Sequence, residues 1–192
     1  MTATADTAPS LDAESVERYA RQIVVPGVGA IGQMRLCAAT VAIVGNDHGA
    51  SAASAYLEAA GLKVCQPPFP HPIDCVVVAD ESGLGALVAL PPTLPEAPIA
   101  WYSLRGTTIR CGLRRAKDPS AGGDVACPSE TVDDPLHVAL HRIGGADAAG
   151  MVTSALLGWI APGEHHEIAF PQLSRSGPGQ PRGGVGTVSE RS

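Results

Sequence analysis

Two segments of the sequence carry side chains or turns suited to binding a phosphate or a metal ion. Each follows an apolar, β-branched run: Gly45–Ser51 follows Thr40–Val44, and Asp80 with Glu81 follows Val76–Ala79. A glycine turn that leads into a helix presents backbone N–H groups to phosphate, and a carboxylate after a parallel strand lies where such sheets bind ligands. The pattern therefore predicts a ligand site at the carboxyl ends of these two strands.

Simpler structural roles are open to the same side chains. Asp47 belongs to the residue types that cap helices, and we expect it to cap a helix beginning near Ser51, with a metal-bridging role as the alternative. Asp80 or Glu81 is equally suited to capping a helix that begins at Ser82.

Cys111 and Cys127 are the candidates for a nucleophile that forms a thioester or persulfide. Such a thiol must be exposed with a lowered pKa, and Arg110 adjoins Cys111, but Cys111 ends an expected strand and burial is the favoured interpretation. The cysteines form no C-x-x-C pair, so we expect no structural zinc. His137 and His141 share one helix face in a ligand-capable spacing; an ordinary amphipathic helix is favoured, and no metal ligand is assigned.

The elements that position these residues alternate between strand and helix. Six strands are expected, at Thr40–Val44, Leu62–Cys65, Asp74–Ala79, Pro98–Ser103, Thr107–Cys111 and His166–Phe170. Helices are expected after Asp12 through about Ile23, and at Ile31–Leu36, Ser51–Ala60, Ser82–Leu90, Leu136–Ile143 and Ala146–Leu157. This order predicts a three-layer α/β/α fold with a mainly parallel central sheet.

Composition predicts one domain with two disordered ends. The domain spans residues 12–173, while 1–11 and the Gly/Ser/Pro/Arg-rich stretch 174–192 are expected to be disordered. The formal net charge of −6 disfavours nucleic acid as a partner. No apolar run is long enough to span a membrane and no signal sequence is evident, so we expect no membrane partner and a cytoplasmic location.

Three stretches in the correct order resemble the ThiF/MoeB/HesA family of the ubiquitin-activating-enzyme-like superfamily. Arg18–Gln33 with Leu36 resembles the opening R-Y-x-R-Q-I…G-x-x-G-Q-x-x-L signature. Val41–Gly61 is similar to V-x-I-V-G-x-G-G-L-G-S…Y-L-A-A-A-G, and segments between Pro98 and Phe170 loosely resemble the late strands and final helix.

The resemblance implies a Rossmann-like fold with a few antiparallel late strands, and a set of functional expectations. Family members are usually dimers that use ATP and Mg²⁺ to adenylate the C-terminal carboxylate of a small sulfur-carrier or ubiquitin-like protein. The nucleotide loop would then include Gly45, Asp47, Gly49 and Ser51. Glu81 or Asp80 would be a remnant of the metal-binding aspartate. Arg21 aligns with an arginine that reaches the partner's nucleotide.

The sequence departs from the family in two places. Asp47, His48 and Ala50 stand at later glycine positions of the loop, so a carboxylate occupies a place where a phosphate would pass. Two negative charges about 4 Å apart repel by about 1 kcal/mol in water and by several times more at lower dielectric. The short connection Gln66–Ile73 supplies no lysine, arginine or acid for the expected ribose and phosphate contacts.

These departures favour a non-catalytic accessory protein over an enzyme. The leading hypothesis is a truncated ThiF-like pseudoenzyme with no cofactor, which forms a homodimer or a heterodimer with a complete relative and binds a partner such as a sulfur carrier. The alternative is a divergent ATP- and Mg²⁺-dependent adenylyltransferase that uses Arg21, Asp80 or Glu81 and a cysteine.

Overall fold

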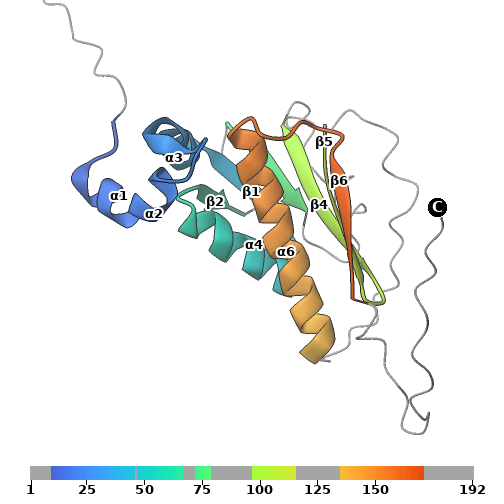
Figure 1. The fold of residues 1–192 in the computed structure, drawn as a ribbon. Helices are drawn as coiled ribbons and strands as arrows, with labels where there is room; N and C mark the ends of the chain where they lie inside the picture. The colour runs from blue at the N-terminus through green and yellow to red at the C-terminus, as the bar shows by residue number, and fades with distance from the viewer. Residues whose placement is uncertain (1–9, 46, 67–71, 79–96, 116–134, 171–192) are drawn as a thin grey trace, which may run out of the picture.

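A six-stranded sheet forms the centre of the fold (Figure 1). The computed structural model describes residues 10–45, 47–66, 72–78, 97–115 and 135–170. Its strands are β1 (Thr40–Val44), β2 (Lys63–Cys65), β3 (Cys75–Val78), β4 (Pro98–Arg105), β5 (Thr108–Arg115) and β6 (His165–Ala169). Its helices are α1 (Ala13–Arg18), α2 (Ala20–Ile23), α3 (Gly29–Ala38), α4 (His48–Ala59) and α6 (Pro135–Leu156).

The sheet has the strand order β2-β1-β3-β4-β5-β6. The first four strands are parallel, and β5 and β6 add to them in antiparallel orientation. Gly106, with a φ of +58°, forms the tight turn between β4 and β5, a backbone conformation that side chains disfavour. The mainly parallel α/β sheet with antiparallel late strands confirms the expected fold class.

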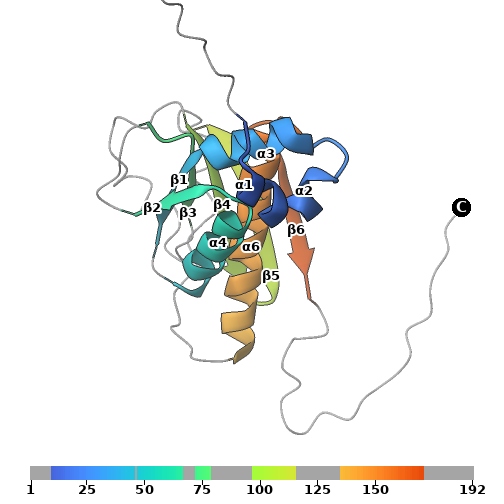
Figure 2. The same ribbon diagram turned by 90° about the vertical axis from the view of Figure 1, so that its left-hand side faces the viewer.

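Helices α4 and α6 cover one face of the sheet and pack against each other (Figure 2). Their apolar side chains join Val41, Ile43, Val77 and Tyr102 in the larger core. The opposite face is also buried, with a smaller cluster from the strands around Val76 and Ile99. The helix expected at Ser82–Leu90 lies outside the described residues.

The N-terminal helices are fastened to the C-terminal end of α4 by side chains of the opening signature. Gln22 Nε2 donates to the Ala59 carbonyl at 3.0 Å, and Gln33 Nε2 donates to the Ala60 carbonyl at 2.9 Å. These bonds satisfy carbonyl groups that a helix end leaves without partners. Gly61 follows with a φ of +95°, which confirms the expected left-handed C-terminal cap.

Two further expectations concerned disorder at the two ends of the chain and membrane-spanning segments. Residues 1–9 and 171–192, which hold most of the two predicted disordered ends, lie outside the described residues. Among the described helices, not one has both the length and the apolar character needed to cross a bilayer.

The expectation of two late helices separated at Gly144 and Gly145 was wrong, because α6 runs through both glycines. The reason is tertiary packing. A Cβ atom on Gly145 would overlap the carbonyl oxygen of Gly49 in α4, and a Cβ on Gly144 would overlap the Tyr102 ring. The glycines therefore let α6 lie directly on α4 and β4, and this contact outweighs their low helix propensity.

We predict that Gly145→Ala destabilises the protein by about 1–3 kcal/mol, because the added methyl group forces α6 away from α4. The matched control is Gly150→Ala in the same helix, where a Cβ would meet no atom within 4 Å. There the substitution should be neutral or stabilising by up to about 1 kcal/mol, since alanine has the higher helix propensity. Urea unfolding of both variants makes the comparison, and equal effects would show that the close contact carries no energetic weight.

Candidate functional site

The N-terminus of α4 lies at the carboxyl end of β1. The next strand in the chain, β2, pairs with one side of β1, and the strand after it, β3, pairs with the other side. Parallel α/β sheets bind ligands at such a switch point. Gly45 leaves β1 with a φ of +122°, which favours glycine, and Asp47 is the N-cap of α4. Asp47 Oδ1 accepts a 2.7 Å bond from the Ala50 N–H. The capping role expected for Asp47 is confirmed, although the helix begins at His48 rather than near Ser51.

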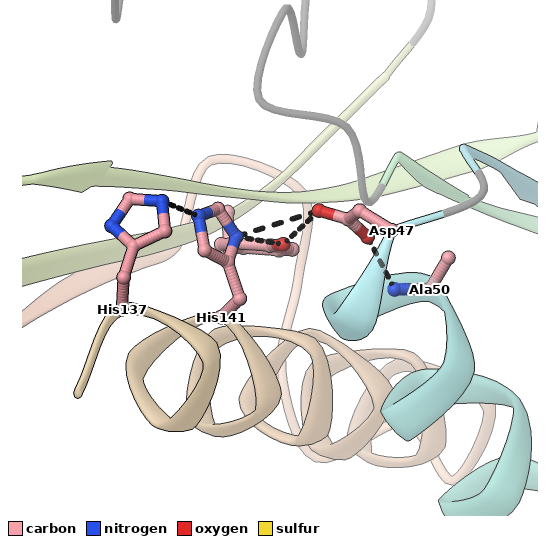
Figure 3. A network of polar contacts seen from close by, with 5 residues as sticks. Asp47, Ala50, His137 and His141 are labelled. Carbon is pink, nitrogen blue, oxygen red and sulfur yellow. Dashed lines mark hydrogen bonds and ion pairs between the residues drawn. The ribbon is translucent and has the colours of Figure 1, made fainter. Parts of the chain in front are cut away.

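The other oxygen of Asp47 enters a chain of polar contacts that reaches across the sheet to α6 (Figure 3). The Tyr102 hydroxyl of β4 donates to Asp47 Oδ2 at 2.8 Å and lies 2.8 Å from His141 Nδ1. His141 Nδ1 is also 3.4 Å from Asp47 Oδ2, and His141 Nε2 is 2.9 Å from His137 Nε2. We call Asp47, Tyr102, His141 and His137 the Asp47 network.

The direction of the hydrogen bonds around Tyr102 follows from its single hydroxyl proton. The Tyr102 hydroxyl has one proton and donates it to Asp47, so its oxygen accepts a hydrogen bond from Nδ1–H of His141. The other ring nitrogen of His141, Nε2, lies 2.9 Å from His137 Nε2, and the tautomers of the two rings decide which of them donates. The two histidines that sequence marked as a possible metal pair thus serve a hydrogen-bonded chain that ends at a carboxylate.

The network is largely shielded from solvent. Tyr102 is 2% exposed and His141 is 3% exposed. Burial by itself raises the pKa of Asp47, but the interactions with His141, the Ala50 N–H and the Tyr102 hydroxyl outweigh it, and the net pKa lies below its usual value. Asp47 is therefore ionised at neutral pH, held by donors from three separate elements.

The Asp47 network occupies the region that the resemblance assigns to the nucleotide phosphates. The Tyr102 hydroxyl fills the space directly over Gly49, where a Cβ atom would overlap it. Gly45 and Gly49 flank Asp47, and Ser51 lies exposed in the first turn of α4, with its N–H bonded to the Asp47 carbonyl at 3.1 Å. The segments expected to form the loop do lie together, but side chains of the protein fill its centre.

Other candidate residues are not brought to this point. Asp80, Glu81 and Cys127 lie outside the described residues, as does most of the Gln66–Ile73 connection. Arg21 is exposed on α2, whose Gln22 contacts the last residue of α4. Asp47 is at the opposite end of α4, on the order of 18 Å from its last residue at 1.5 Å per residue. Within one chain, Arg21 does not join the Asp47 network.

Cys111 does not have the properties required of a nucleophile. It is fully buried in β5, its Sγ lies 3.7 Å from the Gly144 carbonyl, and burial together with the Asp147 carboxylate raises its pKa well above the usual range. A reactive thiol needs exposure and a lowered pKa. This position therefore favours a protonated thiol.

A hollow of about 520 Å³ lies over β5 and β6, and Cys111 and His166 form part of its lining. Its lining includes Trp101, Arg110, His165 and Glu167. Arg110 Nε bonds Glu167 Oε2 at 2.6 Å, and both side chains are about half exposed. None of these residues belongs to the network at the α4 N-terminus, so the two features are distinct.

Sequence reasoning did not identify Tyr102 or connect His141 with Asp47. Tyr102 is 55 positions from Asp47, and His141 is 39 positions from Tyr102. Only the strand order and the close approach of α6 bring these side chains together. The available signal was the Gly144 and Gly145 pair inside an otherwise helical segment, which indicates that another part of the chain approaches closely.

No protein-family model and no curated protein sequence matches the chain. Solved structures match it over most of its length. Selenomethionine PaaA gives a TM-score of 0.54 at 13% identity, covering 88% of this chain and 74% of PaaA. E. coli MccB with MccA-N7isoASN gives 0.57 at 11% identity, covering 80% of this chain and 69% of MccB. E. coli MccB with succinimide gives 0.54 at 12% identity, covering 80% and 68%. The chain has their fold.

PaaA and MccB are ThiF/MoeB-like proteins with the fold of ubiquitin-activating enzymes. The comparison therefore places this chain among Rossmann-like α/β folds, which is the fold class that the sequence predicted. At the level of the fold, the structural neighbours agree with the resemblance seen in the sequence motifs.

We predict that Asp47→Ala lowers the free energy of unfolding by about 2–4 kcal/mol. About 1 kcal/mol comes from loss of the helix cap, and about 1–3 kcal/mol from removing the carboxylate that accepts from the buried Tyr102 hydroxyl and lies beside His141. Asp12→Ala is the matched control, because Asp12 also caps a helix through a 2.7 Å bond to the N–H three residues on, but is exposed and has no network. Urea unfolding should show a clearly smaller loss for Asp12→Ala.

The pH dependence checks that ionised Asp47 carries the effect. Since the folded-state pKa of Asp47 is lowered, its contribution to the free energy of unfolding is present above pH 3.8 and is lost as pH falls through the folded-state pKa. The stability difference between the unmodified chain and Asp47→Asn should therefore shrink below pH 3.8. A difference that stays constant across that range would contradict an ionised, hydrogen-bonded Asp47.

Proposed function

We propose that this chain is a ThiF-like accessory protein, a scaffold that binds a partner in biosynthetic or sulfur-carrier chemistry and has lost efficient ATP binding. The observation that carries the proposal is the Asp47 carboxylate at the N-terminus of α4, bonded to the Ala50 N–H and the Tyr102 hydroxyl. That helix end is where the resemblance locates the nucleotide phosphates. The protein supplies its own anion there.

Electrostatics and space both oppose a phosphate at this helix end. Helix N-termini attract anions because their first N–H groups lack partners and point outward. Here Asp47 already accepts one of those N–H groups and lies beside the others with its negative charge. A phosphate about 4 Å away would be repelled by about 1 kcal/mol in water, and by several times more in a partly buried site. It would also have to displace the Tyr102 hydroxyl from its place over Gly49.

We predict that ATP with Mg²⁺ leaves the melting temperature of the chain unchanged and that no ATP–pyrophosphate exchange occurs with candidate carrier proteins. A ligand at one hundred times its dissociation constant adds about 2.7 kcal/mol of stability, so binding of ordinary strength would be visible by differential scanning fluorimetry. A complete ThiF-like adenylating enzyme serves as the positive control. A clear shift with ATP and Mg²⁺ would sink the accessory interpretation and favour the divergent adenylyltransferase.

The partner surface that we propose lies on the N-terminal helices. Val24 at the end of α2 is 78% exposed and Ile31 in α3 is 66% exposed, with Val16 of α1 also exposed. Large apolar side chains grouped on one segment are typical of protein interfaces. The family resemblance implies dimers, and MccB, a neighbour with this fold, has been solved together with MccA-N7isoASN. Both support a binding role for the scaffold.

Arg21 lies on the same N-terminal segment, next to these apolar side chains, and is exposed. The resemblance aligns it with an arginine that acts across a dimer. In a mixed dimer, Arg21 would therefore reach the nucleotide of a complete relative rather than a site in its own chain.

We predict that the chain forms a dimer in solution through this segment and that Ile31→Glu converts it to a monomer without loss of stability, because a buried interface does not accept an unpaired charge. Sedimentation equilibrium gives the mass, and thermal unfolding checks the fold. Ile143→Glu is the control, since Ile143 is an exposed apolar side chain on α6. If both variants keep the same mass as the unmodified chain, the N-terminal face is not the dimer interface.

A further inference from the structure

A second polar cluster lies between α6 and the two last strands of the sheet, β5 and β6. It consists of Cys111 from β5, Asp147 from α6 and His166 from β6. Cys111 and His166 are directly opposite each other in the antiparallel register, so their side chains leave the sheet on the same face. The Gly144 carbonyl above Cys111 shows that this face is the one covered by α6.

The three side chains converge closely enough to share one small ligand. One potential ligand atom from each lies within 4.8 Å of the others, and His166 Nε2 is 2.5 Å from Asp147 Oδ2. Around a tetrahedral Zn²⁺ ion, with metal–ligand bonds of about 2.0–2.3 Å, such atoms are separated by about 3.4–3.6 Å. Side-chain rotations of Asp147 and His166, which are both partly exposed, would bring the ligand atoms to that spacing.

We propose that Cys111, Asp147 and His166 form a binding site for a divalent transition-metal cation, with Zn²⁺ as the best chemical match. Thiolate, imidazole and carboxylate are the three side-chain ligands of zinc, and together they suit a borderline-soft ion rather than Mg²⁺ or Ca²⁺. The His166 side chain is 44% exposed and that of Asp147 is 24% exposed, so the cation has a route from solvent. Three protein ligands leave a fourth position for water or a small anion.

A divalent cation between the Cys111 sulfur and the Asp147 carboxylate would stabilise both the thiolate and the carboxylate by its charge. Binding forms the metal–sulfur bond and releases the thiol proton to solvent, so no redox partner is involved.

The site is independent of the proposed loss of ATP binding. It shares no residue with the Asp47 network, although Tyr102 of that network lies directly opposite Cys111 in the register of β4 and β5. It also differs from the paired cysteine motifs considered in the sequence, since it uses one cysteine and two other ligand types from three separate elements.

Titration of the full chain with Co²⁺, after chelator treatment and without thiol reductants, tests the proposal. Bound Co²⁺ should give a thiolate-to-cobalt charge-transfer band in the near ultraviolet that saturates at one equivalent. Cys111→Ser should abolish this band. Asp147→Asn and His166→Asn should keep it only at Co²⁺ concentrations raised by at least about tenfold, since each loses a ligand.

Matched controls separate this site from adventitious binding. His165→Asn removes the neighbouring imidazole, which pairs with Gly112 and leaves the opposite face of the sheet, and Cys65→Ser removes a partly buried thiol elsewhere. Both should titrate like the unmodified chain. Absence of a thiolate band, or a band that survives Cys111→Ser, would overturn the proposal. If circular dichroism shows that Cys111→Ser is unfolded, unchanged titrations of both Asp147→Asn and His166→Asn would overturn it instead.

Discussion

The contact between α4 and α6 at Gly49 and Gly145 is the constraint on which both polar clusters depend. Backbone touches backbone there, because a single methyl group on Gly145 would overlap the Gly49 carbonyl. From this fixed point, α6 carries His141 about one turn in one direction, toward Tyr102, and Asp147 about half a turn in the other, toward Cys111. A wider separation of the helices would disconnect both clusters, because hydrogen bonds fail over a few tenths of an ångström.

The Asp47 network changes what the helix N-terminus is available to do. A nucleotide-binding loop keeps its N–H groups free for a ligand and uses glycine to let the ligand approach, and both features cost stability in the empty protein. Asp47 satisfies the Ala50 N–H, and Tyr102 and His141 then satisfy Asp47. Interactions that a ligand would otherwise make are made within the chain, so the fold holds this loop without one.

The sequence predicted the features that depend on local chemistry. The β-branched run Thr40–Val44 is a buried parallel strand, and Asp47 caps the following helix, because side-chain type and neighbouring residues decide both. The expected break in the helix at Gly144 was wrong. The two glycines each lower helix stability by about 1 kcal/mol, but the packing of α6 against α4 outweighs this cost. That packing cannot be read from the sequence of α6 alone. The bonds of Tyr102 to Asp47 and His141 required the register of three strands, which local patterns do not contain.

The arrangement is compatible with the proposed accessory role, in which the chain keeps its fold and its proposed partner surface without binding a nucleotide. The N-terminal helices attach to the far end of α4, where Gln22 and Gln33 bond the Ala59 and Ala60 carbonyls. Asp47 lies about a helix length away, so a substitution there changes neither those bonds nor the exposed apolar side chains of α2 and α3. Sites separated by that distance usually contribute additively to stability. The proposed loss of nucleotide binding at one end of α4 is therefore compatible with the proposed partner surface at the other.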